Sequence, residues 1–205
     1  GEYLPLMSEI EAWLLEDRPQ RFVQLATAAA PEGAASLKRW HDLGAASAAR
    51  LGAEQVIIDV RMRPDADDPI WAEQIKGAGL IYLSGGNPSF LARTLAGTKV
   101  WAAIKREWQA GASLAGCSAG AMALAGYVPD FRHPRNGGVD GLGIVLDDGG
   151  FDEATESQKE IDREELELAL DISVGAAKHV EFDEPGPDVL ESIALDYALA
   201  LSVAD

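Results

Sequence analysis

The sequence has a single cysteine, Cys117, so it cannot form an internal disulfide. It also lacks any apolar run near the roughly 18 residues that a membrane-spanning helix needs. Residues 1–25 do not show the basic start, apolar stretch and small-residue cleavage site of a signal peptide. Together these absences predict a cytoplasmic protein with no membrane partner, with a processed secreted protein as the alternative.

Basic residues are also scarce, with 17 Lys and Arg against 34 Asp and Glu and a formal net charge of −17. Such a chain has no basic surplus to neutralise phosphates, so we expect no nucleic-acid partner. The imbalance is local: residues 1–146 hold 16 acidic and 14 basic side chains, whereas residues 147–205 hold 18 and 3. We interpret the last quarter as a solvated acidic face, with an acidic docking surface as the alternative.

Length and composition fit one globular domain. With 205 residues, of which 47% are hydrophobic, the chain can bury a sizeable core. We therefore expect residues 1–205 to form a single domain, in which the acidic residues 147–205 are an atypical C-terminal part.

Short apolar runs alternate with segments of helical periodicity. Apolar and β-branched composition predicts strands at 21–28, 55–60, 80–83 and 113–116. The intervening segments predict helices at 35–51, 69–76, 88–95, 98–110 and 118–125. This alternation predicts an α/β fold, with a doubly wound, mostly parallel sheet in a three-layer α/β/α arrangement and the functional site at the carboxyl ends of its strands.

The pattern after residue 126 is weaker. We expect a loop at 127–141, which is rich in Pro, Gly and Asp. The remaining segments predict strands at 142–146, 179–182 and 197–203 and helices at 159–170 and 187–195.

The segment Gly116-Cys117-Ser118-Ala119-Gly120 lies between an apolar strand and a helix of small residues. This is the setting of a nucleophile elbow, whose flanking residues must be small and whose central side chain is pushed out above the sheet. The N–H of Ala119 would there face a developing oxyanion. Centred on Ser118 the flanking pair is two glycines, whereas centred on Cys117 it would be two alanines. The spacing favours Ser118 as the nucleophile, with Cys117 as a small buried neighbour.

A second glycine turn, SGGNP at 84–88, follows the predicted strand at 80–83. Glycines at a strand end let backbone N–H groups approach a substrate oxygen closely. Alone this signal is weak, because such turns are common. Paired with the elbow about thirty residues later, the turn is a candidate second half of an oxyanion hole.

The stretches IYLSGGNPSFLARTL and LAGCSAGAM, which contain these turns, resemble the dipeptidase E and cyanophycinase family of serine peptidases. The resemblance runs from residue 21 to residue 126, with GLGIV at 141–145 and YALALSV at 197–203 as weaker matches. It implies a fold like that of the class I glutamine amidotransferases. It also implies cleavage of a peptide or isopeptide bond through serine, histidine and an acid, without a metal or an organic cofactor.

Residue roles follow from the same resemblance. By position it implies Ser118 as nucleophile, Gly86 and Ala119 as donors of oxyanion-hole N–H groups, and Asn87 as a residue that shapes the substrate pocket. The chain departs from the family at its start, where Gly1 stands at the turn that would follow the family's first strand.

The catalytic histidine does not match the family pattern, which implies a histidine before a Phe-Asp-Glu sequence soon after GLGIV; Gly150 stands there. A second such triplet, at 182–184, has His179 just upstream, and residues 179 and 181 of a strand face the same way. His179 is therefore our expected base and His133 the alternative. His41 is interpreted as a surface residue of an amphipathic helix. The candidate acids are Asp183 and Glu181 near His179, and Asp130 and Asp140 near His133.

These observations predict a serine hydrolase that cleaves a small peptide or related amide, with a homodimer as one possible assembly. Two alternatives stay open. A chain without a working histidine would be a non-catalytic binding or assembly member of the same fold. Amidotransferase-like chemistry would instead use Cys117.

Overall fold

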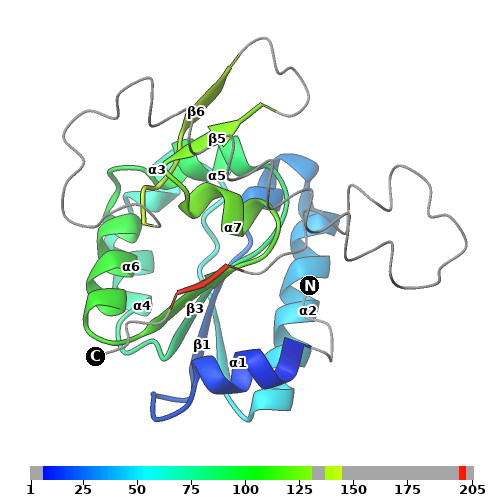
Figure 1. The fold of residues 1–205 in the computed structure, drawn as a ribbon. Coiled ribbons are helices and arrows are strands. Elements are labelled where there is room, and N and C mark those ends of the chain that lie inside the picture. Colours follow the sequence, from blue (N-terminus) through cyan, green and yellow to red (C-terminus); the bar gives the residue numbers. More distant parts are fainter. Residues whose placement is uncertain (1–6, 131–136, 145–198, 202–205) are drawn as a thin grey trace, which may run out of the picture.

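The computed structural model describes residues 7–130, 137–144 and 199–201. At its centre is a five-stranded sheet in the order β2-β1-β3-β4-β7 (Figure 1). The strands are β1 (Arg21–Leu25), β2 (Glu54–Ile57), β3 (Leu80–Leu83), β4 (Ser113–Gly116) and β7 (Leu199–Leu201). Strands β1, β2, β3 and β4 run parallel to one another, and β7 pairs antiparallel with β4.

Helices cover both faces of the sheet (Figure 1). One face packs against α1 (Ser8–Leu14) and α2 (Ala34–Leu51). The other packs against α3 (Arg63–Ala66), α4 (Pro69–Gln74), α5 (Pro88–Leu95), α6 (Lys99–Gln109) and α7 (Ala119–Leu124). A 3-10 helix, η2 (Thr27–Glu32), follows β1. This is the predicted α/β fold with a mostly parallel central sheet.

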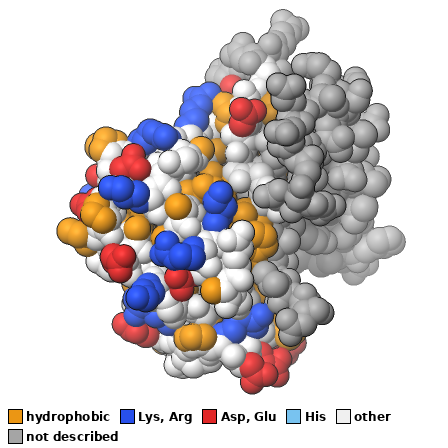
Figure 2. Space-filling model, turned by 90° about the vertical axis from the view of Figure 1, so that its left-hand side faces the viewer, with side chains coloured by type: hydrophobic (Ala, Val, Ile, Leu, Met, Phe, Trp, Pro, Cys, Tyr) orange, Lys and Arg blue, Asp and Glu red, His pale blue; other side chains and the backbone are white. Residues whose placement is uncertain are grey.

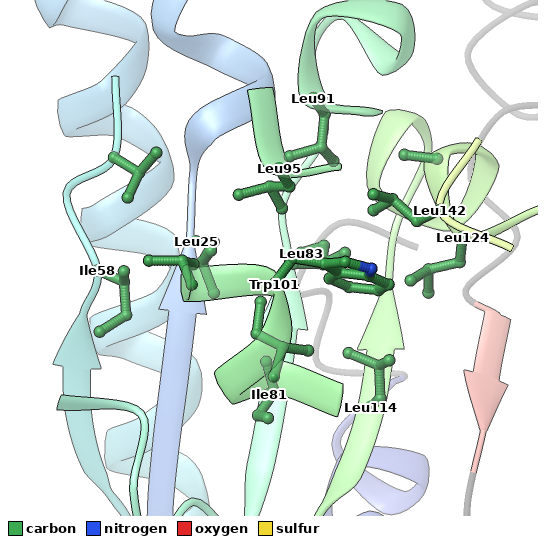
Figure 3. Packing of buried hydrophobic residues seen from close by; sticks show 14 of the residues in the cluster. Leu25, Ile58, Ile81, Leu83, Leu91, Leu95, Trp101, Leu114, Leu124 and Leu142 are labelled. Atoms are coloured by element: carbon green, nitrogen blue, oxygen red, sulfur yellow. The ribbon is translucent and has the colours of Figure 1, made fainter. Parts of the chain in front are cut away.

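Alternate side chains of β1, β3 and β4 enter two separate cores, because successive residues of a strand point to opposite faces. The first core, toward α4–α7, receives Val23, Leu25, Ile81, Leu83 and Leu114 (Figure 3). The second, toward α1 and α2, receives a second set from the same strands, Phe22, Leu80, Tyr82, Ala115 and Cys117. Phe22 and Tyr82 stack there with ring centroids 5.7 Å apart.

Polar side chains cap three helices, α4, α5 and α6, which begin within one residue of their predicted starts. The side chains of Asp68, Asn87 and Thr98 accept hydrogen bonds from backbone N–H groups in the first turns of α4, α5 and α6. Pro at the first position of α4 and of α5 has no N–H that would need a partner there. The predicted bounds of β3, β4 and α5 are confirmed.

Two predicted strands are longer than those observed. The segment 21–28 leaves the sheet after Leu25 and enters η2, and the strand predicted at 55–60 spans Glu54–Ile57. Helices α1 and α3 were not predicted. The predictions at 159–170, 179–182 and 187–195 lie outside the described residues.

The region after α7 corrects two predictions. The expected loop at 127–141 contains an antiparallel pair, β5 (Tyr127–Pro129) and β6 (Gly138–Asp140). The strand expected at 142–146 is not a strand over 142–144. There the backbone N–H groups of Leu142, Gly143 and Ile144 donate to the carbonyls of residues 123, 125 and 124 instead. These bonds satisfy carbonyls at the end of α7 that have no partner within the helix.

Charges of both signs cover the side of the molecule where α4 and α6 lie. Figure 2 shows Lys and Arg side chains interspersed with Asp and Glu on that face. This mixture fits the near balance of charge over residues 1–146. No helix of the described residues is long and apolar enough to cross a membrane.

Candidate active site

Ser118 lies on the turn between β4 and α7 and is half-buried. Its backbone has φ 48° and ψ −120°, a positive φ that fits a tight strand-to-helix turn. A residue with a side chain seldom adopts this conformation, which costs roughly 1–3 kcal/mol and persists only where the surroundings impose it. The structure therefore holds Ser118 in a strained backbone conformation at the carboxyl end of a central strand.

The glycines on either side of Ser118 have no room for a side chain. A Cβ atom on Gly116 would lie 2.6 Å from the carbonyl carbon of Gly120. A Cβ atom on Gly120 would lie 2.0 Å from the backbone oxygen of Leu83, on the neighbouring strand β3. Both contacts are with backbone atoms, which cannot move aside cheaply. The turn thus requires glycine at both positions, whereas the motif in general requires only small residues there.

Cys117 is fully buried beside Ser118 and belongs to the core under α2. Its N–H donates to the Leu83 backbone oxygen at 3.1 Å, and its backbone oxygen accepts from Gly120 at 2.8 Å. The thiol therefore packs below the turn, as a small apolar residue does.

The second glycine turn, residues 84–87, ends β3 next to the first. Gly86 has φ 139°, and a Cβ atom there would lie 2.4 Å from the carbonyl of Ala28 in η2. A Cβ atom on Gly85 would lie 3.4 Å from the Cβ of Ser118. The two turns, far apart in sequence, are therefore in contact at the carboxyl edge of the sheet.

Two backbone N–H groups at this edge lack a described acceptor. Across residues 7–130, 137–144 and 199–201, neither Gly86 nor Ala119 donates a backbone hydrogen bond outside regular helix and strand pairing. Ala119 is also the first residue of α7, where helical N–H groups have no partner within the helix. Neither N–H group is therefore used by the described backbone bonds that build the two turns.

Asn87 has an observed structural role. Its side-chain oxygen accepts a hydrogen bond of 2.9 Å from the Phe90 N–H and so caps α5. The residue is exposed. Its predicted part in shaping a substrate pocket stays a prediction.

His41 is the one histidine within the described residues, and it lies near the β2 edge of the sheet. Its backbone oxygen accepts from Gln55 on β2, and the charged groups that act on its ring are Asp59, Arg61 and Asp42. Partial burial is the main cause that lowers the pKa of His41. The predicted bases His179 and His133, with the acids Asp183 and Glu181, lie outside the described residues.

The remaining candidate acids lie by the β5–β6 pair. Asp140 ends β6, opposite Tyr127, and Asp130 follows β5, where its N–H donates to Gly137. Across the described ranges, no group of three or more His, Cys, Asp or Glu side chains is placed to hold a metal ion.

A buried polar cluster under the second turn escaped the sequence analysis. The fully buried Gln24 on β1 donates through its Nε2 to the Trp40 backbone oxygen and to Ser84 Oγ. Its Oε1 accepts from Gln55 Nε2. The signal was a lone amide in the otherwise apolar run RFVQLA, because a polar group is buried only with partners.

A family model described as peptidase family S51 matches residues 39–145, a stretch that contains both glycine turns. The chain belongs to peptidase family S51. This confirms the dipeptidase E-type family predicted from the sequence, and with it a peptidase-type hydrolase.

A solved structure agrees with membership of family S51. A peptidase from an acI-B1 Actinobacterium is 42% identical, with a TM-score of 0.68; the match covers 78% of this chain and 71% of that chain. A protein from Listeria monocytogenes EGD-e, named as a candidate peptidase E, is 20% identical over 77% of this chain and 81% of its own, with a TM-score of 0.49. No curated protein matches the sequence.

Proposed function

We propose that this S51 chain is a serine peptidase that cleaves a small peptide or isopeptide amide with Ser118 as its nucleophile. The observation that carries the proposal is the backbone of Ser118, which has φ 48° between two glycines that cannot accept a Cβ atom. A turn this constrained presents one side chain above the sheet. The fully buried Cys117 supports serine rather than cysteine as the attacking residue.

The reaction follows the usual order for acyl transfer. Ser118 Oγ attacks the carbonyl carbon while its proton passes to a base, and the N–H groups of Gly86 and Ala119 donate to the resulting oxyanion. The C–N bond then breaks, the amine leaves with the proton from the base, and water hydrolyses the ester left on Ser118. Two observations support this assignment: the two turns are in contact, and the N–H groups of Gly86 and Ala119 have no described backbone acceptor.

His179 is the base that we propose, with Asp183 or Glu181 as the acid that orients it, and His133 is the alternative. The base is distinguished by two single substitutions. His179→Ala is expected to lower kcat by about 100-fold or more, whereas His133→Ala is expected to leave it within about twofold. The opposite result assigns the base to His133. The expected cytoplasmic location and a homodimer stay predictions.

The test of the nucleophile is labelling with a fluorophosphonate, which phosphonylates an activated serine and releases fluoride. Wild-type protein is expected to be labelled at Ser118, and Ser118→Ala is expected to be neither labelled nor active while retaining its melting temperature. The matched control is Ser36→Ala, which changes a serine near the start of α2 that is not among the buried residues of that helix. This variant should be labelled like wild type. Wild-type turnover of a cleaved peptide by Ser118→Ala would overturn the proposal.

A further inference from the structure

Gln24 lies between the parts of the molecule that hold the nucleophile turn in place. It is on β1 and faces α2, within a core that is otherwise mostly apolar. Its Nε2 donates to the Trp40 backbone oxygen at 2.8 Å and to Ser84 Oγ at 3.2 Å, and its Oε1 accepts from Gln55 Nε2 at 2.9 Å. One amide therefore joins strand β1, helix α2, strand β2 and the turn after β3.

The approach of Gln24 to α2 depends on a glycine. A Cβ atom on Gly44 would lie 2.2 Å from Gln24 Oε1. The side-chain amide thus fits against the helix backbone where Gly44 leaves space, one turn after Trp40. Gln55 extends the cluster, since its Nε2 also donates to the His41 backbone oxygen at 2.9 Å.

Two of the residues that Gln24 contacts, Ser84 and Trp40, border Gly85. Ser84 is the residue before it, and two ring carbons of Trp40 lie 2.9 Å from where a Cβ atom of Gly85 would be. Gly85 in turn lies against Ser118, because the same Cβ atom would be 3.4 Å from Ser118 Cβ. Trp40 and Ser84 therefore connect Gln24 to the turn at 84–87, and this turn lies against Ser118.

We infer that Gln24 is a positioning residue, which fixes the Gly86 N–H relative to Ser118 by holding Ser84 and the Trp40 segment of α2. The inference rests on the proposed function, in which that N–H donates to the oxyanion. Hydrogen bonds are directional, so a buried amide with several partners fixes geometry in a way that apolar packing does not. An oxyanion donor displaced by a fraction of an ångström loses much of its effect in the transition state but little in substrate binding.

The test compares Gln24→Met, which keeps the volume and removes the amide, with Gln20→Met as matched control. Gln20 precedes the same strand and donates to the backbone oxygens of residues 15 and 18, away from the site. We expect Gln24→Met to lower kcat about tenfold with KM within about twofold of wild type, and Gln20→Met to change neither. Equal kcat values for the two variants would overturn the inference.

Ser84→Ala supplies a milder variant should Gln24→Met fold poorly. It is expected to lower kcat about threefold, and adding it to Gln24→Met should cause little further loss, because both changes break one link. Additive losses from the two substitutions would contradict a shared link.

Hydrogen exchange separates this inference from the proposed function. The backbone amides of Ser84 and Asn87, which donate to the carbonyls of Leu25 and Ala28, are expected to exchange at least about tenfold faster in Gln24→Met than in Gln20→Met. Unchanged exchange would overturn the positioning role even in an active enzyme. A wild-type protein that neither takes the fluorophosphonate nor cleaves peptides would overturn the proposed function, while faster exchange would still support the positioning of the turn.

Discussion

On the face toward α4–α7 the buried side chains of β1, β3 and β4 are all apolar, among them Val23, Ile81 and Leu114. On the face toward α1 and α2 the same strands also bury Gln24, Ser84 and Ser113. Each of these has a hydrogen-bond partner, and Ser113 Oγ donates to the Leu14 backbone oxygen. The helices of this face add a buried pair of their own, Glu11 and Ser47.

The two faces illustrate two effects of a protein core, which are stabilisation of the fold and selection of one geometry. Apolar burial is non-directional and stabilises the fold roughly in proportion to the area removed from water. Buried hydrogen bonds contribute less net stability but select one arrangement of the groups they join. We therefore expect substitutions in the apolar face to change mainly stability, and substitutions in the polar face to change mainly geometry.

The largest effect on stability is expected from Ile81→Ala, in the middle of β3 on the apolar face. The side chain is fully buried, so its truncation loses transfer energy and leaves a cavity. We expect the free energy of unfolding to fall by about 3 kcal/mol, against about 1 kcal/mol for the control Ile81→Val. Urea denaturation measures both. A loss for Ile81→Ala no greater than for Ile81→Val would mean that this face is not the main source of stability.

An intermediate effect is expected from Gly44→Ala on the polar face. In an exposed helix interior this change stabilises by up to about 1 kcal/mol. Here the new methyl group would meet Gln24 Oε1 at 2.2 Å, so we expect a loss of about 1–2 kcal/mol.

The control for Gly44→Ala is the same change in a Gln24→Ala background, where the obstruction is gone. There we expect it to stabilise the fold, as helix propensity predicts. A stabilising Gly44→Ala in the wild-type background would show that Gln24 moves aside readily and does not fix the helix.

The smallest effect is expected from Glu11→Gln. Burial raises the pKa of Glu11, against the hydrogen bond from Ser47 and the charge of Arg50, which lower it. The folded state therefore binds a proton more tightly than the unfolded state, and stability falls as pH rises from the ordinary carboxyl range through the raised pKa. We expect Glu11→Gln to raise the melting temperature slightly at pH 7, with the gain vanishing near pH 4. A gain that persists at pH 4 would contradict this cause.

Most of the fold between residues 21 and 126, although not α3 or the ends of β1 and β2, could be predicted because local signals and tertiary structure agree there. The bounds of α5 follow from the Asn87 cap and the proline after it, and β3 is a four-residue apolar run between turn residues. Where tertiary contacts determine the local structure, the sequence pattern gave a wrong prediction. Residues 142–144 look like a strand but pair with the end of α7, a partner that no local pattern reveals.

The candidate site, too, has a part that could be predicted from the sequence and a part that could not. The two glycine turns were predictable because tight turns demand specific residues. The contact between them was only an expectation from their place at the carboxyl ends of parallel strands, and the Gln24 cluster was not predicted at all. Hydrogen bonds between β1, α2 and the turn after β3 join residues up to 60 positions apart, as Gln24 and Ser84 are. No spacing rule within one segment can indicate them.

The shape of the turn at Ser118 is determined by its neighbours. Backbone atoms exclude a Cβ atom at residues 116 and 120, and the central side chain takes no part in that exclusion. The scaffold and the reactive atom are therefore independently variable. A single substitution at Ser118 could replace the hydroxyl group by a thiol, or remove it, while every backbone contact that builds the turn is retained. In this architecture a change of chemistry, or its loss, is structurally a small step.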